Sequence, residues 1–281
     1  MFRRQTTGSV VCVSCGYLVG VKDDRCYNCG RRNPGLWGYA GAIKRLGNDL
    51  GFTPLVITIC AVMFGISLLM SHGQVGMQGF GFLSPHPYAL IQAGASGLVP
   101  VTMMDRYWTV LSAIWLHGSL LHIVLNMMFM RQLAPTVGEF YGPGRTVLIY
   151  VGAGVISFIV STSAASFNLP MSGGGLTVGA SGAIFGLLGA MLYYGRRTGA
   201  SHIRAAIMPT ILMNFMIGIS MPGIDNYAHL GGLAGGYLVS ALLDPLKPER
   251  PAHMMAALVC IALSIGSLLL SLFVPSGLPS L

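Results

Sequence analysis

The stretch Gly179-Ala180-Ser181-Gly182-Ala183-Ile184-Phe185-Gly186 places one serine between small residues, where a glycine-rich run at 173–175 gives way to a long apolar segment. Small neighbours leave the Ser181 hydroxyl uncrowded and allow another backbone to approach it closely. The apolar segment is predicted to be a helix, and the N–H groups of a helix's first turn have no partners inside the helix. They can therefore bind a negatively charged oxygen. A serine beside free amides is half of an acyl-transfer site, and the other half is a base.

The composition is that of an integral membrane protein. Of the 281 residues, 53% are hydrophobic and only 9% are charged, whereas soluble domains have about 25% charged residues. We therefore predict an all-α membrane domain over 54–274, preceded by a soluble module at 1–35 and a juxtamembrane linker at 36–53. A membrane span needs roughly 20 apolar residues, and apolar segments of about this length lie at 54–70, 115–133, 146–167, 177–195, 203–220, 226–243 and 254–273.

Basic residues are distributed unevenly about these predicted spans. Of the 16 Lys and Arg residues, 15 lie before the first span or in the connections after the second, fourth and sixth spans. Arg131 is assigned to the connection after the second span. Only Arg106 lies in a connection on the opposite side. By the positive-inside rule the N-terminus is cytoplasmic and the C-terminus is outside. We expect a multi-pass protein of the bacterial inner membrane, surrounded by the lipid bilayer.

Four N-terminal cysteines form two Cys-x-x-Cys pairs, Cys12 with Cys15 and Cys26 with Cys29. Two such pairs can direct four thiolates at one ion, so they predict a structural Zn²⁺ site in a zinc-ribbon-like module. The alternatives are two disulfides or four unpaired thiols. Zinc is favoured because so short a polar segment needs a metal to fold, and because a cytoplasmic setting disfavours disulfides. Whether the module binds a cytoplasmic protein partner stays open.

Polar side chains recur near the starts of the second, fourth and sixth predicted spans. These spans run in the same direction, so their starts share one membrane face. Ser181 lies about one turn into the fourth span and His229 about one turn into the sixth, while His122 and Asn126 share one face of the second. Polar residues inside a membrane are costly and usually face the bundle interior or a wet cavity. The alternative for Ser181 is a structural hydrogen bond within its own helix.

Glycines in the sixth span predict close helix packing. Gly231, Gly232, Gly235 and Gly236 form overlapping faces of small residues, which commonly serve helix association alone. Close packing against the fourth span would nevertheless bring His229 to Ser181. Asp225, one turn before His229, invites a catalytic-triad interpretation, but we predict that it caps the start of the sixth span.

Three motifs lie in order on these spans: His122-x-x-x-Asn126, Gly179-Ala180-Ser181-Gly182 and Ala228-His229-x-x-Gly232-x-x-x-Gly236. With them, the chain resembles the rhomboid family of intramembrane serine proteases over about 54–274. The resemblance implies a bundle of six core transmembrane helices plus a C-terminal seventh. It implies that Ser181 is the nucleophile and His229 the general base, with no cofactor for catalysis.

The same resemblance implies an oxyanion hole formed by the Ser181 backbone N–H and the side chains of His122 and Asn126. It also implies that the substrates are single-span membrane proteins, cut in or near a destabilised transmembrane segment. The chain departs from some family members at Phe185, where they have a tyrosine that stacks on the histidine; phenylalanine can also stack.

Three classes of function compete: an intramembrane protease, a non-catalytic rhomboid-like binder of membrane segments in quality control or trafficking, and a transporter or channel. The presence of both Ser181 and His229 favours the protease. The sequence shows no charged residue deep in a predicted span and no inverted repeat, which disfavours a transporter. We expect no nucleic-acid partner.

Overall fold

The computed structural model describes residues 4–13, 15–170, 175–220 and 223–277. Gly173 and Gly174 of the glycine-rich run lie outside these ranges. The chain divides into two compact units, Met1–Gly51 and Phe52–Leu281, and each is described by itself.

The N-terminal unit is a small ribbon. Strands β1 (Ser9–Val11) and β2 (Leu18–Gly20) pair antiparallel, with Val10 opposite Val19. A short turn of helix η1 (Leu36–Gly38) and helix α1 (Ala40–Lys44) follow. The unit has a small core of buried side chains from Val10, Cys12, Val19, Cys26 and Ala40. Two of these five side chains are cysteines, so apolar burial alone stabilises this unit only weakly.

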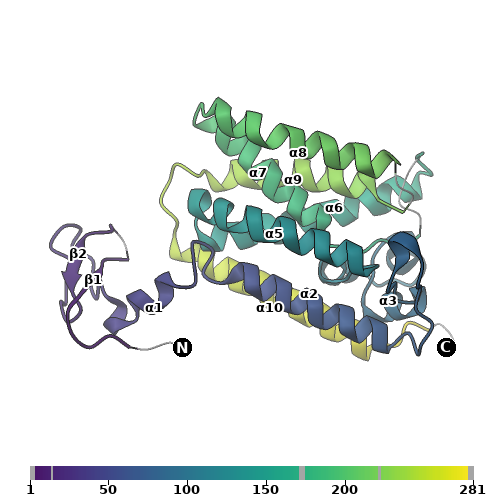
Figure 1. The fold of residues 1–281 in the computed structure, drawn as a ribbon, viewed down its shortest axis with the longest axis horizontal. Coiled ribbons are helices and arrows are strands. Elements are labelled where there is room, and N and C mark those ends of the chain that lie inside the picture. The colour runs from purple at the N-terminus through teal and green to yellow at the C-terminus, as the bar shows by residue number, and fades with distance from the viewer. Residues whose placement is uncertain (1–3, 14, 171–174, 221–222, 278–281) are drawn as a thin grey trace. The chain divides into compact units, whose positions relative to one another are not determined.

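The second unit contains seven long helices among the described residues, which confirms the prediction of an all-α membrane protein (Figure 1). These helices are α2 (Phe52–Leu69), α5 (Leu120–Tyr141), α6 (Pro143–Ser166), α7 (Ser181–Arg197), α8 (Ser201–Ser220), α9 (Asn226–Leu243) and α10 (Pro251–Phe273).

Helix α5 differs most from its prediction, which ran from 115 to 133. The chain breaks before it, and Ser119 starts the helix by accepting a hydrogen bond from the His122 backbone N–H at 3.3 Å. The helix then continues past Pro135 to Tyr141. Arg131, assigned from the sequence to the following connection, therefore lies halfway along α5.

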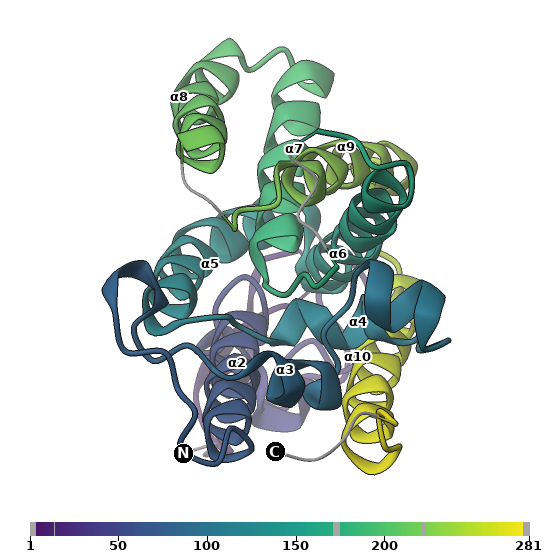
Figure 2. The same cartoon turned by 90° about the vertical axis from the view of Figure 1, so that its right-hand side faces the viewer.

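Four of the described helices are long and apolar enough to cross a membrane: α2, α6, α8 and α10. A fifth crossing results if the short helices at Thr109–Trp115 and α5, which are bent by 89°, form one broken span. Helix α7 is shorter, and its residues Gly182–Met191 are all buried. Figure 2 shows α7 between α5 and α9, so protein rather than lipid covers most of it.

The segment between α2 and α5 contains short helices instead of a span: η2 (Gly79–Gly81), α3 (Pro87–Ala93), η3 (Val99–Met103), α4 (Thr109–Ser112) and η4 (Ala113–Trp115). Its Ser96 forms an antiparallel bridge with Thr177 in the approach to α7. The buried Arg106 donates hydrogen bonds to the carbonyls of Ile91 and, at 2.9 Å, Ser271. These contacts join the segment both to α10 and to the chain that leads into Ser181.

Candidate active site

Ser181 and His229 meet at the interface between α7 and α9. Ser181 is the first residue of α7 and is half-buried, while His229 lies in the first turn of α9 and is buried. The Ser181 Oγ lies 3.0 Å from the His229 Nε2, which is a hydrogen-bond distance. The geometry is that of a serine whose proton can pass to an adjacent imidazole.

Glycines allow the two helices to approach this closely. A Cβ placed on Gly232 would lie 2.0 Å from the carbonyl oxygen of Gly182, and one on Gly236 would lie 2.0 Å from that of Gly186. The other two glycines of α9, Gly231 and Gly235, instead face Val160 and Ile156 of α6. The predicted small-residue faces therefore contact two different helices, and one of them brings His229 to Ser181.

Aromatic side chains hold the His229 ring in place. Phe185 stacks on it with ring centroids 4.3 Å apart and an interplanar angle of 15°, and Phe215 of α8 contacts Phe185 edge-on at 5.3 Å. A phenylalanine thus provides the stacking expected at this position. The buried Nδ1 of His229 has no hydrogen-bond partner among the described residues, so no carboxylate orients this ring there.

The start of α7 is open to a ligand oxygen. Its N-cap residue, Ala180, has no side chain that could accept a hydrogen bond from the first-turn N–H groups. Gly179 has φ +134°, which an L side chain rarely adopts. A Cβ at Gly179 would occupy a space 2.8 Å from the His122 Nε2 and 3.7 Å from the Ser181 Oγ. This glycine therefore keeps clear a space bordered by both side chains.

His122 presents a hydrogen-bond donor to that space. Its Nδ1 accepts a hydrogen bond from the Gly118 backbone N–H at 3.3 Å. In a neutral imidazole one nitrogen accepts while the other carries the hydrogen, so the Nε2 beside Gly179 is a donor. Asn126 is buried, and its Nδ2 donates to the His122 carbonyl at 2.8 Å, which leaves its second amide hydrogen for another acceptor.

Asp225 joins the two segments that carry Ser181 and His229. Its Oδ1 accepts a hydrogen bond from the Ala228 backbone N–H at 2.9 Å, which confirms the predicted N-cap of α9. Its Oδ2 accepts hydrogen bonds from the hydroxyl of Ser161 in α6 and, at 3.1 Å, from that of Thr177. Both carboxylate oxygens thus bond to groups other than the His229 Nδ1. Asp225 therefore positions the segments that carry Ser181 and His229 and does not hydrogen-bond to the imidazole ring.

The roles of Ser161 and Thr177 were missed in the sequence. Thr177 lies four residues before Ser181, as Asp225 lies four before His229, and this matched spacing is the only local signal. Ser161 belongs to α6 and is 64 residues from Asp225, so only the packing of the helices brings it to the carboxylate.

We expect Asp225→Ala to lower reporter cleavage by about 10- to 100-fold, because loss of the cap and of both hydroxyl contacts lets His229 move relative to Ser181. Asp225→Asn keeps oxygen and nitrogen atoms able to bond the same partners, so it should stay within a few-fold of wild type. Cleavage rate and thermal unfolding in micelles measure the two effects. Asp244→Asn, at the other end of α9, is the matched control. An Asn variant as impaired as the Ala variant would mean that the charge, rather than the position, of Asp225 matters.

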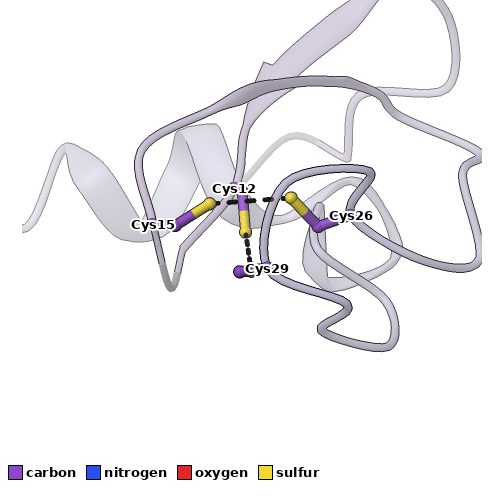
Figure 3. Close-up of side chains that lie close together, drawn as sticks. All are labelled: Cys12, Cys15, Cys26 and Cys29. Atoms are coloured by element: carbon purple, nitrogen blue, oxygen red, sulfur yellow. Dashed lines mark hydrogen bonds between the residues drawn. The ribbon is translucent and has the colours of Figure 1, made fainter.

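The four N-terminal cysteines gather around one point (Figure 3). Their sulfur atoms all lie within 4.8 Å of one another, with Cys12 3.8 Å from Cys29 and Cys15 3.6 Å from Cys26. Sulfurs bound tetrahedrally at about 2.3 Å from a zinc ion are about 3.8 Å apart, whereas a disulfide bond measures about 2.05 Å. The cluster could therefore hold a metal ion, and its spacing fits a tetrahedral thiolate site.

The close thiols affect one another's protonation. The Tyr17 backbone N–H lowers the pKa of Cys15 to about 6. The Arg31 backbone N–H also lowers the pKa of Cys29, but the neighbouring cysteine sulfurs, that of Cys15 most of all, outweigh it and raise that pKa to about 11. Four thiolates so close repel one another, and a divalent cation at their centre would compensate this repulsion.

A family model and several curated relatives all match this chain to rhomboid proteins. The model of the Rhomboid domain family matches residues 104–245. Rhomboid protease GluP of Bacillus subtilis is 34% identical over 175 residues, which are 61% of this chain and 33% of GluP. RHOMBOID-like protein 4 of Arabidopsis thaliana is 33% identical over 57% of this chain and 40% of that protein. The putative rhomboid protease YdcA of B. subtilis is 32% identical over 52% of this chain and 71% of YdcA.

The chain thus matches a third to two fifths of the length of the first two relatives and most of YdcA. The Rhomboid family model covers half of the chain, including His122, Asn126, Ser181 and His229. A multi-span membrane protein with this match belongs to the rhomboid family.

Proposed function

We propose that this chain is an intramembrane serine endopeptidase that cleaves single-span membrane proteins in or near their transmembrane segment. The observation that carries the proposal is the 3.0 Å contact between the Ser181 Oγ and the His229 Nε2. Membership of the rhomboid family, whose relatives include proteins named as proteases, supports it.

In this proposal His229 removes the hydroxyl proton as Ser181 attacks the scissile carbonyl. The proton moves to Nε2, and His229 then gives it to the leaving amine as the peptide C–N bond breaks. Water, deprotonated by His229, next hydrolyses the ester between Ser181 and the substrate. The stacked Phe185 keeps the imidazole plane fixed through both proton transfers.

The negative charge on the tetrahedral intermediate needs hydrogen-bond donors. The Ser181 backbone N–H, the His122 Nε2–H and the free amide hydrogen of Asn126 are the proposed donors. The uncapped start of α7 and the clear space at Gly179 support this assignment. Loss of one such donor typically costs about 10²–10³-fold in rate.

A substrate helix must unwind before it can react, because its backbone carbonyls are hydrogen-bonded within the helix and shielded from the nucleophile. We therefore propose substrates whose spans contain small, helix-destabilising residues near the cleavage point. We also propose the orientation that the basic residues favour, with a cytoplasmic N-terminus and the C-terminus outside, in a bacterial inner membrane.

Labelling by a fluorescent fluorophosphonate tests whether Ser181 is an activated nucleophile. Wild-type protein in micelles should be labelled, and Ser181→Ala should not, because the reagent needs a serine whose proton a neighbouring base accepts. Ser166→Ala, which removes a serine at the end of α6, is the matched control and should be labelled like wild type. Folded wild-type protein that remains unlabelled would favour a non-catalytic binder of membrane segments.

The N-terminal module is proposed to bind one structural Zn²⁺ through Cys12, Cys15, Cys26 and Cys29. The closeness of the four sulfurs, which all lie within 4.8 Å of one another, supports this proposal, and so does the small core of the ribbon. The ion would hold the two cysteine-bearing turns together and takes no part in the serine chemistry. A cytoplasmic protein partner for this module remains part of the proposal.

Replacing Cys26 and Cys29 together by serine should reduce the zinc content from about one ion per chain to none, because two remaining thiolates cannot complete a tetrahedral site. Elemental analysis of the purified proteins measures this, and limited proteolysis should show that the N-terminal unit has become easier to cut. Cys260→Ser, which changes a cysteine of α10, should keep the metal. A double variant with unchanged zinc would refute the assignment.

A further inference from the structure

A groove lies on the surface of the membrane unit between α2 and α5. Its volume is about 530 Å³, and its lining consists of Ile57 from α2 with Val124, Met127, Met128, Arg131 and Gln132 from α5. The groove is separate from the Ser181–His229 pair, to which none of these residues belongs.

Arg131 is the unexpected member of this lining. It lies midway along the 22-residue helix α5, about 15 Å from either end at a rise of about 1.5 Å per residue. The side chain is exposed and has no hydrogen bond or ion pair within the described parts of the chain. Helix α5 is a candidate membrane span only together with the bent segment before it. An arginine exposed on such a helix is costly in lipid unless an anion compensates its charge.

Along α5 the lining of the groove changes from apolar to polar side chains. Val124, Met128 and Arg131 follow at helical spacing on one exposed face, and the side chains of Val124 and Met128 are 53% and 46% exposed. An apolar strip thus ends at a guanidinium with the Gln132 amide beside it. A long arginine side chain can keep its stem on apolar surface while its charged head reaches a polar group.

This combination matches one kind of molecule in the surroundings of the protein. A phospholipid carries an acyl chain for the apolar strip and a phosphate for the guanidinium, which can bind two phosphate oxygens through paired N–H groups. A small soluble anion satisfies only the charge. A zwitterionic lipid brings its own ammonium group, which competes for the phosphate, so an anionic headgroup is favoured.

We propose that the groove binds one anionic phospholipid, with its phosphate at Arg131 and Gln132 and one acyl chain along Ile57, Val124 and Met128. The bound lipid compensates the charge of Arg131 and covers the groove between α2 and α5. The proposal is independent of the catalytic roles of Ser181 and His229.

Native mass spectrometry of the full chain tests it, with phosphatidylglycerol and phosphatidylcholine of identical acyl chains added in turn to the micelles. Wild type should retain one phosphatidylglycerol about tenfold more tightly than phosphatidylcholine. Arg131→Met should lower the affinity for phosphatidylglycerol to that for phosphatidylcholine. Arg131→Lys, which keeps the charge but not the paired donors, should fall between the two.

Arg204→Met is the matched control, because Arg204 is an exposed arginine of α8 that does not line the groove. It should keep the wild-type preference, and circular dichroism should show equal helicity in all variants. The proposal is overturned if wild type shows no preference, if Arg131→Met binds like wild type, or if Arg204→Met loses as much. Competition by soluble glycerol phosphate would also overturn it, because the site would then recognise phosphate without the acyl chain.

Discussion

Alanine in place of Ser181 or His229 is expected to lower cleavage of a single-span reporter by at least about 10⁴-fold, because nucleophile and base act as one unit. The proposed nucleophile and base are 3.0 Å apart, so losing either side chain removes the proposed proton transfer. Purified wild type and variants, reconstituted with the reporter in vesicles, measure kcat/KM directly.

Matched controls come from residues of the same types outside the site. Ser166→Ala at the end of α6 and His202→Ala at the start of α8 should cleave at the wild-type rate. Residual cleavage by the Ser181 variant would mean that another residue is the nucleophile. Full activity of the His229 variant would mean that another group accepts the proton.

The second large effect is expected from Gly236→Ala, which adds one methyl group two turns away from His229. That carbon would lie 2.0 Å from the carbonyl oxygen of Gly186, and the clash is with backbone, so no side chain can rotate away from it. Separating α9 from α7 should destabilise the protein by about 1–3 kcal/mol. A shift of about 1 Å between Ser181 and His229 should lower cleavage by about 10²-fold.

Thermal unfolding and reporter cleavage, measured on the same preparation, test both parts of this prediction. Gly65→Ala in α2 and Gly266→Ala in α10 are matched controls, because nothing lies within 4 Å of a Cβ at either position. Both should be neutral or slightly stabilising, since alanine is the better helix former. A Gly236 variant that behaves like these controls would show that the α7–α9 packing does not position the pair.

Much of this protein was predictable from its sequence, for physical reasons that act locally. The thickness of the bilayer sets the length of an apolar segment that crosses it. The bounds of the long helices could therefore be predicted to within several residues, except for those of α5. The spacing of Cys12, Cys15, Cys26 and Cys29 is likewise a local property, since each pair of thiols must reach one point. Asp225 was predicted as an N-cap because its partner, Ala228, is three residues away.

The prediction for the end of α5 is wrong because polar residues and Pro135 are typical of a loop. In the structure the helix continues to Tyr141, where it packs against other helices. Arg131 therefore lies in the middle of helix α5 instead of in a connection, and from that helix it lines the groove beside α2.

Only the tertiary structure decided which residues lie side by side across helices. The glycines of α9 indicate close packing, but the sequence does not say that Gly232 and Gly236 face α7 while Gly231 and Gly235 face α6. The contacts of Asp225 with Ser161 and Thr177 depend on the same packing. A helix presents its side chains in a periodic order that the sequence records. The partner of each face depends on how several helices fill the shared space, and no local pattern contains that information.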